Sequence, residues 1–182
     1  MRHFAAVTLF CSCTLIGCAQ GGSGATAPHA ELRTQADGAE GQRLSLRLKD
    51  NPCATVIALT VPISPGVIRQ LDQGTCNLSR LGTVDFVSDK VLQLALGTQT
   101  IQATFTTVDG DVLRAVGRGE NTPSGPGKVA FVATIDFVGG TGRFAAATGR
   151  ARSVGVADLI ARTSTSVLNG TVVYDELDRN NR

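Results

Sequence analysis

The alternation of apolar and polar residues along the chain from residue 42 onward predicts β-strands. Apolar side chains recur at every second position in residues 44–48, 101–105 and 129–137. Successive side chains of a strand point to opposite faces, so this period is typical of strands that bury one face. We expect the remaining strands over residues 54–61, 81–88, 91–97, 112–118, 149–157 and 164–174.

Residues that favour turns separate these stretches. Asn51-Pro52 is expected to end the first strand, and Ser88-Asp89-Lys90 to separate two later ones. Asp109-Gly110 is a strong hairpin signal, residues 120–127 predict an exposed loop, and Asn169-Gly170 predicts a bulge or tight turn. Many short, evenly spaced strands predict an all-β fold, a single small closed antiparallel barrel of about eight strands, because closure removes exposed edges.

Residues 64–75 fit two structures. Ser64-Pro65 and Gly74 could bound a short helix, or residues 67–75 could return as a strand. A hairpin centred between Ser64 and Pro65 would place Cys53 opposite Cys76, at a separation that suits a disulfide. A nine-residue helix would rise only about 13 Å, which is too short to bring the chain back along the preceding strand. The strand is therefore favoured.

The composition supports an all-β domain and excludes a nucleic-acid-binding surface. The chain has 182 residues, 42% of them hydrophobic but only 4% aromatic, with no Trp. Its length suits one domain with appendages. The net charge of +2 gives no basic patch for nucleic acid.

The first 41 residues predict an exported, lipid-anchored protein. Residues 4–16 form an apolar stretch that is too short to span a bilayer but suits a signal peptide. Leu15-Ile16-Gly17-Cys18 resembles the lipobox of bacterial lipoproteins. That resemblance implies removal of residues 1–17, lipid on Cys18 as the attachment to the membrane, and, with Ala19 next, passage to the outer membrane. A lipoprotein of that membrane can face either side, and we expect the domain to face the periplasm. Residues 18–41 are rich in small and polar residues and predict a flexible tether, which leaves residues 42–182 as the domain.

The cysteines that remain after processing form a single pair. Cys11 and Cys13 leave with the signal peptide, and Cys18 takes the lipid. In an oxidising periplasm Cys53 and Cys76 are expected to form a disulfide, worth about 3 kcal/mol in the chain-entropy model. The alternative is a pair of buried thiols.

A glycine-rich stretch between two predicted strands, residues 138–149, has two interpretations. Gly-Gly-Thr-Gly-Arg after a strand resembles a dinucleotide-binding loop. However, position 145 is Ala, and the 33 residues after Gly149 are too few for the parallel strands and helices of that fold. The favoured interpretation is a structural corner of the barrel, with Phe144 plugging its end, residues 145–147 in a short helical turn, and Arg143 bonded to loop carbonyls or solvated. The corner residues are Gly139, Gly140, Gly142, Arg143, Phe144 and Gly149.

The same stretch carries a resemblance to a known family. Gly-Gly-Thr-Gly-Arg-Phe-Ala-x-Ala-Thr-Gly resembles the signature of secreted bacterial proteins of the allene oxide cyclase-like (dirigent-like) barrel type. Residues 74–82, with Arg80 at the usual His, the Asp-Gly-Asp-Val-Leu of residues 109–113, and residues 168–172 follow in the expected order. The resemblance implies a barrel fold. The related plant proteins cyclise an oxidised fatty acid or steer radical coupling, but the matched motifs are structural and carry over no functional residue.

The domain contains few residues with catalytic chemistry. It has no histidine, which excludes a Ser-His-Asp or Cys-His arrangement and the common zinc sites. We expect no catalytic residue, no metal and no cofactor. Five polar residues could line a cavity or lie outside the barrel, because the strand phase is open: Asp85, Arg114, Arg118, Arg152 and Tyr174.

These observations predict a lipid-anchored barrel protein of the cell envelope without catalytic activity. It would bind a small apolar ligand or serve a structural or interaction role. The alternative is a cyclase- or isomerase-like enzyme acting on a hydrophobic substrate in the barrel cavity. A dinucleotide-dependent oxidoreductase is a distant third.

Overall fold

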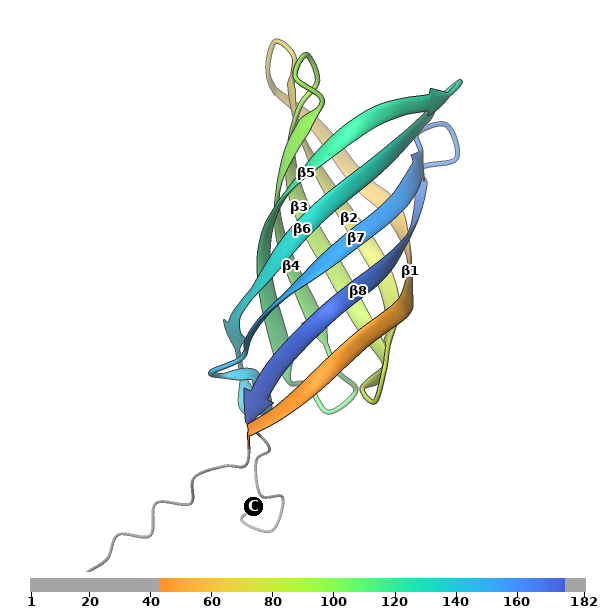
Figure 1. Cartoon of the computed structure of the whole chain (residues 1–182). Coiled ribbons are helices and arrows are strands. Elements are labelled where there is room, and N and C mark those ends of the chain that lie inside the picture. The colour runs from red at the N-terminus through yellow and green to blue at the C-terminus, as the bar shows by residue number, and fades with distance from the viewer. Residues whose placement is uncertain (1–42, 176–182) are drawn as a thin grey trace, which may run out of the picture. The chain divides into compact units, whose positions relative to one another are not determined.

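The computed structural model describes residues 43–175, which form a closed antiparallel β-barrel (Figure 1). Each strand pairs with the next one along the chain, and the last strand pairs with the first, so every strand has two neighbours. The expected all-β barrel of about eight strands is confirmed. The strands are β1 (Arg43–Ser64), β2 (Val67–Leu78), β3 (Gly82–Gln93), β4 (Thr98–Thr106), β5 (Val112–Gly125), β6 (Lys128–Gly140), β7 (Thr148–Asp158) and β8 (Thr163–Asp175), with a 3₁₀ turn, η1 (Gly142–Phe144).

The predicted signal peptide, Cys18 and the tether lie outside the described residues. Within residues 43–175, no helix is long and apolar enough to cross a membrane. The barrel holds its own hydrophobic core and leaves no strand edge unpaired. We therefore expect residues 42–182 to fold as an independent unit.

Strand β1 is one continuous strand, so the predicted break at Asn51-Pro52 is wrong. Residues 43–56 of β1 pair with β8, and residues 53–64 pair with β2. The strand instead contains a bulge just before Asn51-Pro52, where Lys49 and Asp50 together face Asn169 of β8. Asp50 takes a left-handed φ of 53°, and its N–H donates to Asn169 Oδ1 at 2.8 Å. The bulge therefore lies in β1, and Asn169-Gly170, expected to be irregular itself, sits within regular β8.

Two further predicted interruptions are also absent. Ser88-Asp89-Lys90 lies in the middle of β3, whose turn comes later at residues 94–97. The expected loop at residues 120–127 is mostly the end of β5, and the turn comprises only Pro126-Gly127. In a barrel, both edges of each strand are paired, so a strand can continue through polar residues and glycines that would end an isolated hairpin.

The hairpin of β1 and β2 confirms the strand interpretation of residues 67–75. Its turn lies at Pro65-Gly66, where Gly66 has φ 74°. Two register shifts in β1 bring Cys53 opposite Cys76 as expected. The disulfide joins them with a Cα–Cα distance of 4.0 Å. Cys53 also pairs with Ser166 of β8, so the disulfide lies where β1 passes from one neighbour to the other.

The interior of the barrel is packed at one end, which we call the closed end. Phe144 is fully buried there and lies edge-on to Tyr174, with ring centroids 5.1 Å apart. Phe105 contacts both Phe86 and Phe137 further along the axis, at centroid distances of 4.9 and 6.1 Å. Inward aliphatic residues fill the remaining space: Leu46, Leu48, Leu78, Val84, Leu113 and Val172.

Candidate functional site

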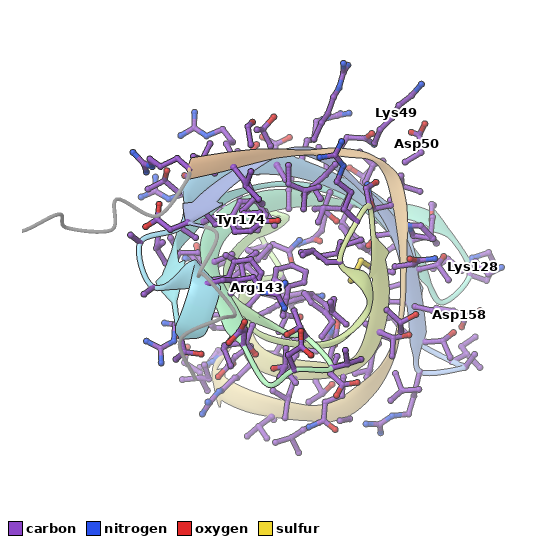
Figure 2. All side chains as sticks on the ribbon, turned by 90° about the horizontal axis from the view of Figure 1, so that it is seen from below. Lys49, Asp50, Lys128, Arg143, Asp158 and Tyr174 are labelled. Atoms are coloured by element: carbon purple, nitrogen blue, oxygen red, sulfur yellow. A yellow bond between two sulfur atoms is a disulfide. The ribbon has the colours of Figure 1, made fainter. Side chains whose placement is uncertain are left out.

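The glycine corner between β6 and β7 is a structural device at the closed end. Arg143 Nε donates to Asp111 Oδ2, and Arg143 Nη2 donates to Asp109 Oδ2, both at 2.8 Å. The expectation of carbonyl partners or solvent was therefore wrong. The guanidinium also lies 5.5 Å from the Phe144 ring centroid, and in the end-on view of Figure 2 Arg143 and Tyr174 both lie over this end. Arg143 thus links the β4–β5 turn to Phe144, which fills this end of the barrel.

The glycines of this corner are required by close approach. A Cβ on Gly142, which has φ 56°, would lie 1.8 Å from Asp111 Oδ1. A Cβ on Gly140 would lie 1.8 Å from the carbonyl oxygen of Val112. The helical turn expected over residues 145–147 occurs earlier, as η1. These close approaches are those of a tightly packed backbone corner.

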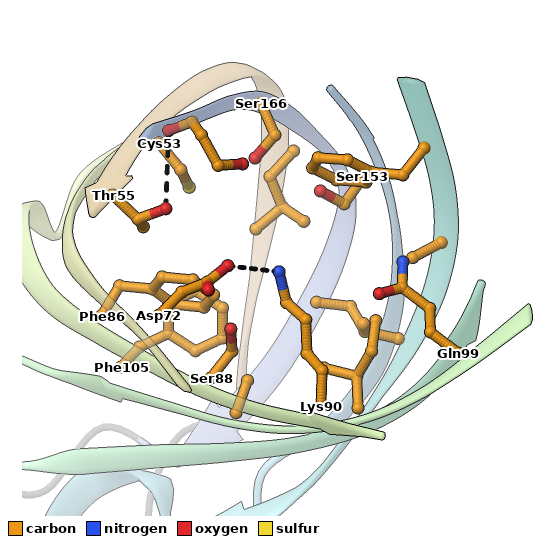
Figure 3. Close-up of a pocket in the computed structure, with 17 residues that line it drawn as sticks. Cys53, Thr55, Asp72, Phe86, Ser88, Lys90, Gln99, Phe105, Ser153 and Ser166 are labelled. Carbon is orange, nitrogen blue, oxygen red and sulfur yellow. Dashed lines mark hydrogen bonds and ion pairs between the residues drawn. The ribbon is translucent and has the colours of Figure 1, made fainter. Parts of the chain in front are cut away.

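The opposite end of the barrel, the open end, contains a cavity of about 200 Å³. Its walls are largely apolar, and its polar lining residues include Gln70, Lys90, Gln99 and Asn121. A second, deeper cavity of about 40 Å³ lies further along the axis (Figure 3). Lys90, Gln99 and Phe131 line both cavities, so they form the boundary between them. The apolar walls of the outer cavity come from Ile68, Leu92, Leu94, Val129, Phe131, Ala157 and Leu159.

A buried ion pair forms the floor of the open half. Lys90 Nζ lies 2.5 Å from Asp72 Oδ2, and the two side chains are 11% and 1% exposed. Gln70 Nε2 donates to the other carboxylate oxygen, Asp72 Oδ1, at 2.8 Å. Lys90 Nζ also lies 5.5 Å from the centroid of Phe131, a cation–π distance. The two opposite charges therefore neutralise one another inside the barrel, beside the aromatic ring of Phe131.

The β2–β3 hairpin places these polar groups together. Gln70 is directly opposite Lys90, and Asp72 is directly opposite Ser88. The two residues of each strand are two positions apart, so their side chains share one face of that strand. All four side chains are buried, which places this face inside the barrel. Figure 3 shows Asp72, Ser88 and Lys90 directed into the same space. The site is thus built by one hairpin and closed from the other side by β4, β6 and β8.

Ser88 has an unused hydrogen-bonding group in this cavity. Its Oγ is fully buried and has no hydrogen-bond partner among the described residues. Buried hydroxyls normally have a partner, and leaving one unsatisfied costs about 1–3 kcal/mol. Ser88 lines the 40 Å³ cavity, which has room for a water or for one polar group of a ligand. An oxygen or nitrogen atom placed there would complete the site.

The sequence-based candidates fall in other places. Tyr174 points into the barrel, but at the packed closed end. Four others lie on the exterior: Asp85, Arg114, Arg118 and Arg152. Sequence reasoning missed Ser88 and Lys90 because residues 88–90 were interpreted as a turn, and it did not single out Asp72 in the favoured strand of residues 67–75. The signal that could have found them is the two-residue alternation of residues 84–92, which continues through Ser88 and Lys90 without a glycine or proline.

Ion pairs on the barrel exterior lower the pKa values of two outward carboxylates. A hydrogen bond from Arg69 holds the pKa of Asp89 below its ordinary value, and Arg150 does the same to Asp136. Arg69 Nε lies 2.9 Å from Asp89 Oδ1. These outward carboxylates therefore stay ionised at neutral pH.

In residues 43–175, no three His, Cys, Asp or Glu side chains converge in a way that could hold a metal ion. The disulfide lies inside the barrel wall, where Cys53 lines the deeper cavity. Comparisons with known family models, curated proteins and solved structures found no match to this chain.

Proposed function

We propose that this protein binds a small, uncharged, mostly apolar molecule in the open half of its barrel. The observation that carries the proposal is the division of the interior. One half is filled by side chains, whereas the other holds a largely apolar cavity that ends at a buried ion pair, with an unsatisfied hydroxyl in the smaller cavity beyond it. Small barrels either fill their interior or hold one ligand, and this barrel divides the two roles between its ends.

The size of the cavity limits the ligand. Its volume of about 200 Å³ exceeds the ~150 Å³ engineered cavity that admits benzene and is below the ~300–1,000 Å³ of pockets for drug-sized ligands. A single substituted ring or a short branched chain fits these limits. Larger molecules would have to extend out of the open end.

The charges of the floor favour a neutral ligand. An anion that drew Lys90 away would leave the carboxylate of Asp72 buried without its partner, and a cation would leave Lys90 in the same position. A neutral molecule with one hydroxyl or carbonyl group avoids this cost. Its polar group can approach Ser88 Oγ or the amide of Gln99, while its apolar part contacts Phe131 and Val129.

The cellular setting is part of the same proposal. The lipobox-like residues 15–18 support lipid attachment through Cys18 and a place in the cell envelope, most simply as an outer-membrane lipoprotein facing the periplasm. The Cys53–Cys76 disulfide supports an oxidising compartment. The protein would then hold its ligand at the membrane surface without converting it.

The buried pair also favours a second candidate, an isomerase- or cyclase-type enzyme for a hydrophobic substrate. Asp72, Lys90 and Ser88 converge in an enclosed site, as acid–base catalysis requires. Under this alternative, Asp72→Asn would retain binding of a substrate and lose its turnover. Under the binding proposal, no turnover occurs with either protein.

The proposal can be tested with small aromatic probes on residues 42–182, purified with the disulfide formed. We expect para-cresol to bind in saturation-transfer NMR, and benzoate, a charged probe of similar size, to give no signal. Ala157→Trp fills the open cavity and should abolish the para-cresol signal, whereas the matched exterior variant Ala54→Trp should retain it. Equal binding of both probes, or unchanged binding by Ala157→Trp, would overturn the proposal.

A further inference from the structure

The open end of the barrel carries a group of exposed large apolar side chains. They lie near the end of β1 and in the β3–β4 and β7–β8 connections, and each is between 49 and 78% exposed. We call them the rim residues: Ile63, Leu94, Leu96, Leu159 and Ile160. Leu94 and Leu159 also line the open cavity, so the rim is continuous with the apolar wall of the ligand site. Figure 1 shows these turns together at the end of the barrel farthest from the start of β1.

The turn segments of the same end carry little charge. Residues 62–66, 94–97, 123–127 and 159–162 contain one charged residue, Arg162. Lys128 and Asp158 directly flank two of these segments and pair with each other, with Lys128 Nζ 4.0 Å from Asp158 Oδ2. Arg162 is engaged, because its Nε and Nη2 donate to the carbonyl oxygen of Ile57 at 3.1 and 2.8 Å.

The three turns of the closed end are different. They carry Arg80, Asp109, Asp111 and Arg143 and one exposed large apolar residue, Val108. Turn residues are ordinarily polar, so the open end departs from the common pattern.

The backbone of the rim turns is already hydrogen-bonded inside the protein. The Leu94 N–H donates to the Gly66 carbonyl at 2.8 Å, and the Leu159 N–H donates to the Gly127 carbonyl at 2.7 Å. Both bonds join neighbouring turns. The Ile160 N–H donates to Asp158 Oδ1 at 3.0 Å. Backbone donors without a partner are costly away from water, so these bonds remove the main obstacle to placing the turns in a low-polarity environment.

We propose that the rim residues dock the open end of the barrel onto the surface of a lipid bilayer. Single exposed apolar residues are normal, but five of them on or beside the turns of one end, whose turn segments hold a single charged residue, form a surface that water solvates poorly. The rim surrounds an opening and consists of separate turn tips. Such a shape suits insertion among lipid headgroups better than contact with a flat protein face. Insertion would be driven by apolar burial and not by charge.

The length of the chain permits this orientation even with lipid on Cys18. The start of β1 lies at the closed end, away from the rim (Figure 1). A strand of 13 residues, such as β6, tilted by about 40° gives the barrel a height of about 30 Å. Residues 18–43 comprise 25 Cα-to-Cα steps, which span at most about 85 Å. The chain can therefore reach from a bilayer that the rim contacts, along the barrel, to Arg43.

Docking of the rim would place the cavity opening against the apolar part of the membrane. An apolar ligand could then pass between bilayer and barrel without crossing water. The docking itself rests on the rim alone and does not require that the cavity hold a ligand.

Two single-tryptophan variants test the orientation, since the chain has no natural Trp. Leu96→Trp places the reporter on the rim, and Val108→Trp places it on the closed end at a site that is 87% exposed. Both are made in residues 42–182, which lack the apolar residues 4–16 and Cys18, and are mixed with phosphatidylcholine vesicles containing brominated lipid. We expect a blue shift and quenching for Leu96→Trp and neither for Val108→Trp. No change in either variant, a change in both, or a change only in Val108→Trp would overturn the proposal.

A charge-insertion pair measures the strength of docking. Leu96→Asp combined with Ile160→Asp should lower the vesicle partition coefficient at least tenfold, whereas Val108→Asp should leave it unchanged. Raising the salt concentration from about 0.1 to about 1 M shortens the Debye length from about 10 to 3 Å and should not release the unaltered protein. Release by salt, or unchanged partitioning of the double variant, would contradict apolar docking. In solution, the double variant should still bind para-cresol, which separates failure of docking from failure of the ligand site.

Discussion

Replacing Lys90 with methionine would remove one half of the buried ion pair and leave the other. Asp72 is 1% exposed and would keep only the hydrogen bond from Gln70. Breaking a buried pair in this way costs about 3–5 kcal/mol, because an uncompensated charge stays in the interior. The double variant Asp72→Leu with Lys90→Met removes both charges and keeps similar volumes. It is expected to lie between neutral and about 4 kcal/mol more stable than the natural protein.

Urea unfolding of residues 42–182 measures both variants, read as the free energy of unfolding at an unchanged m-value. The structure predicts strong non-additivity, with the single variant much less stable than the double variant. Should Lys90→Met be too unstable to hold a native baseline, the double variant still gives a full transition. A cost below about 1 kcal/mol for Lys90→Met, or a double variant less stable than the single one, would refute the reasoning that the pair is buried and mutually dependent.

Three further predictions follow from the wall of the barrel. Replacing both Cys53 and Cys76 with alanine should lower the free energy of unfolding by about 3 kcal/mol, and an unchanged urea midpoint would contradict this. Phe144→Ala should lower the free energy of unfolding by about 3–5 kcal/mol, because the Phe144 side chain is fully buried. A melting temperature within about one degree of that of the natural protein would contradict a stabilising role for Phe144 at this end. The hydrogen bond from Arg69 lowers the pKa of Asp89. The small stabilisation from this ion pair is therefore present above the unfolded aspartate pKa of about 3.9 and is lost as pH falls through the lower folded value. Arg69→Ala should raise the pKa of Asp89 in an NMR titration, and an unchanged pKa would contradict the assignment.

The barrel could be predicted from the sequence because its outer and inner faces alternate cleanly. Residues 129–137 and 101–105 bury the expected face, and the two-residue period fixes the phase of each strand. The pairing of Cys53 with Cys76 followed from the same hairpin logic and is confirmed. Lipid attachment at Cys18 stays a prediction, since residue 18 lies outside the described residues.

The candidate site could not be predicted, for a reason that is also physical. Turn-forming residues in the sequence do not reveal whether a strand has partners on both sides. Asp89 looks like a turn residue, yet in β3 it faces outward to Arg69, while Ser88 and Lys90 face inward on either side of it. Only the partner strand shows that Asp72 lies opposite Ser88 and within reach of Lys90. Inward polar residues of this kind are visible once the register is known.

The position of a bound small molecule tests the central claim most directly. Crystals of residues 42–182 grown with para-bromophenol would report that position through the anomalous scattering of bromine. Binding in the open half predicts a bromine peak inside the barrel, close to Phe131 and Gln99, with the phenol oxygen directed toward Ser88 or Lys90. Bromine found only on the exterior, or a barrel that excludes the phenol at saturating concentration, would contradict the account.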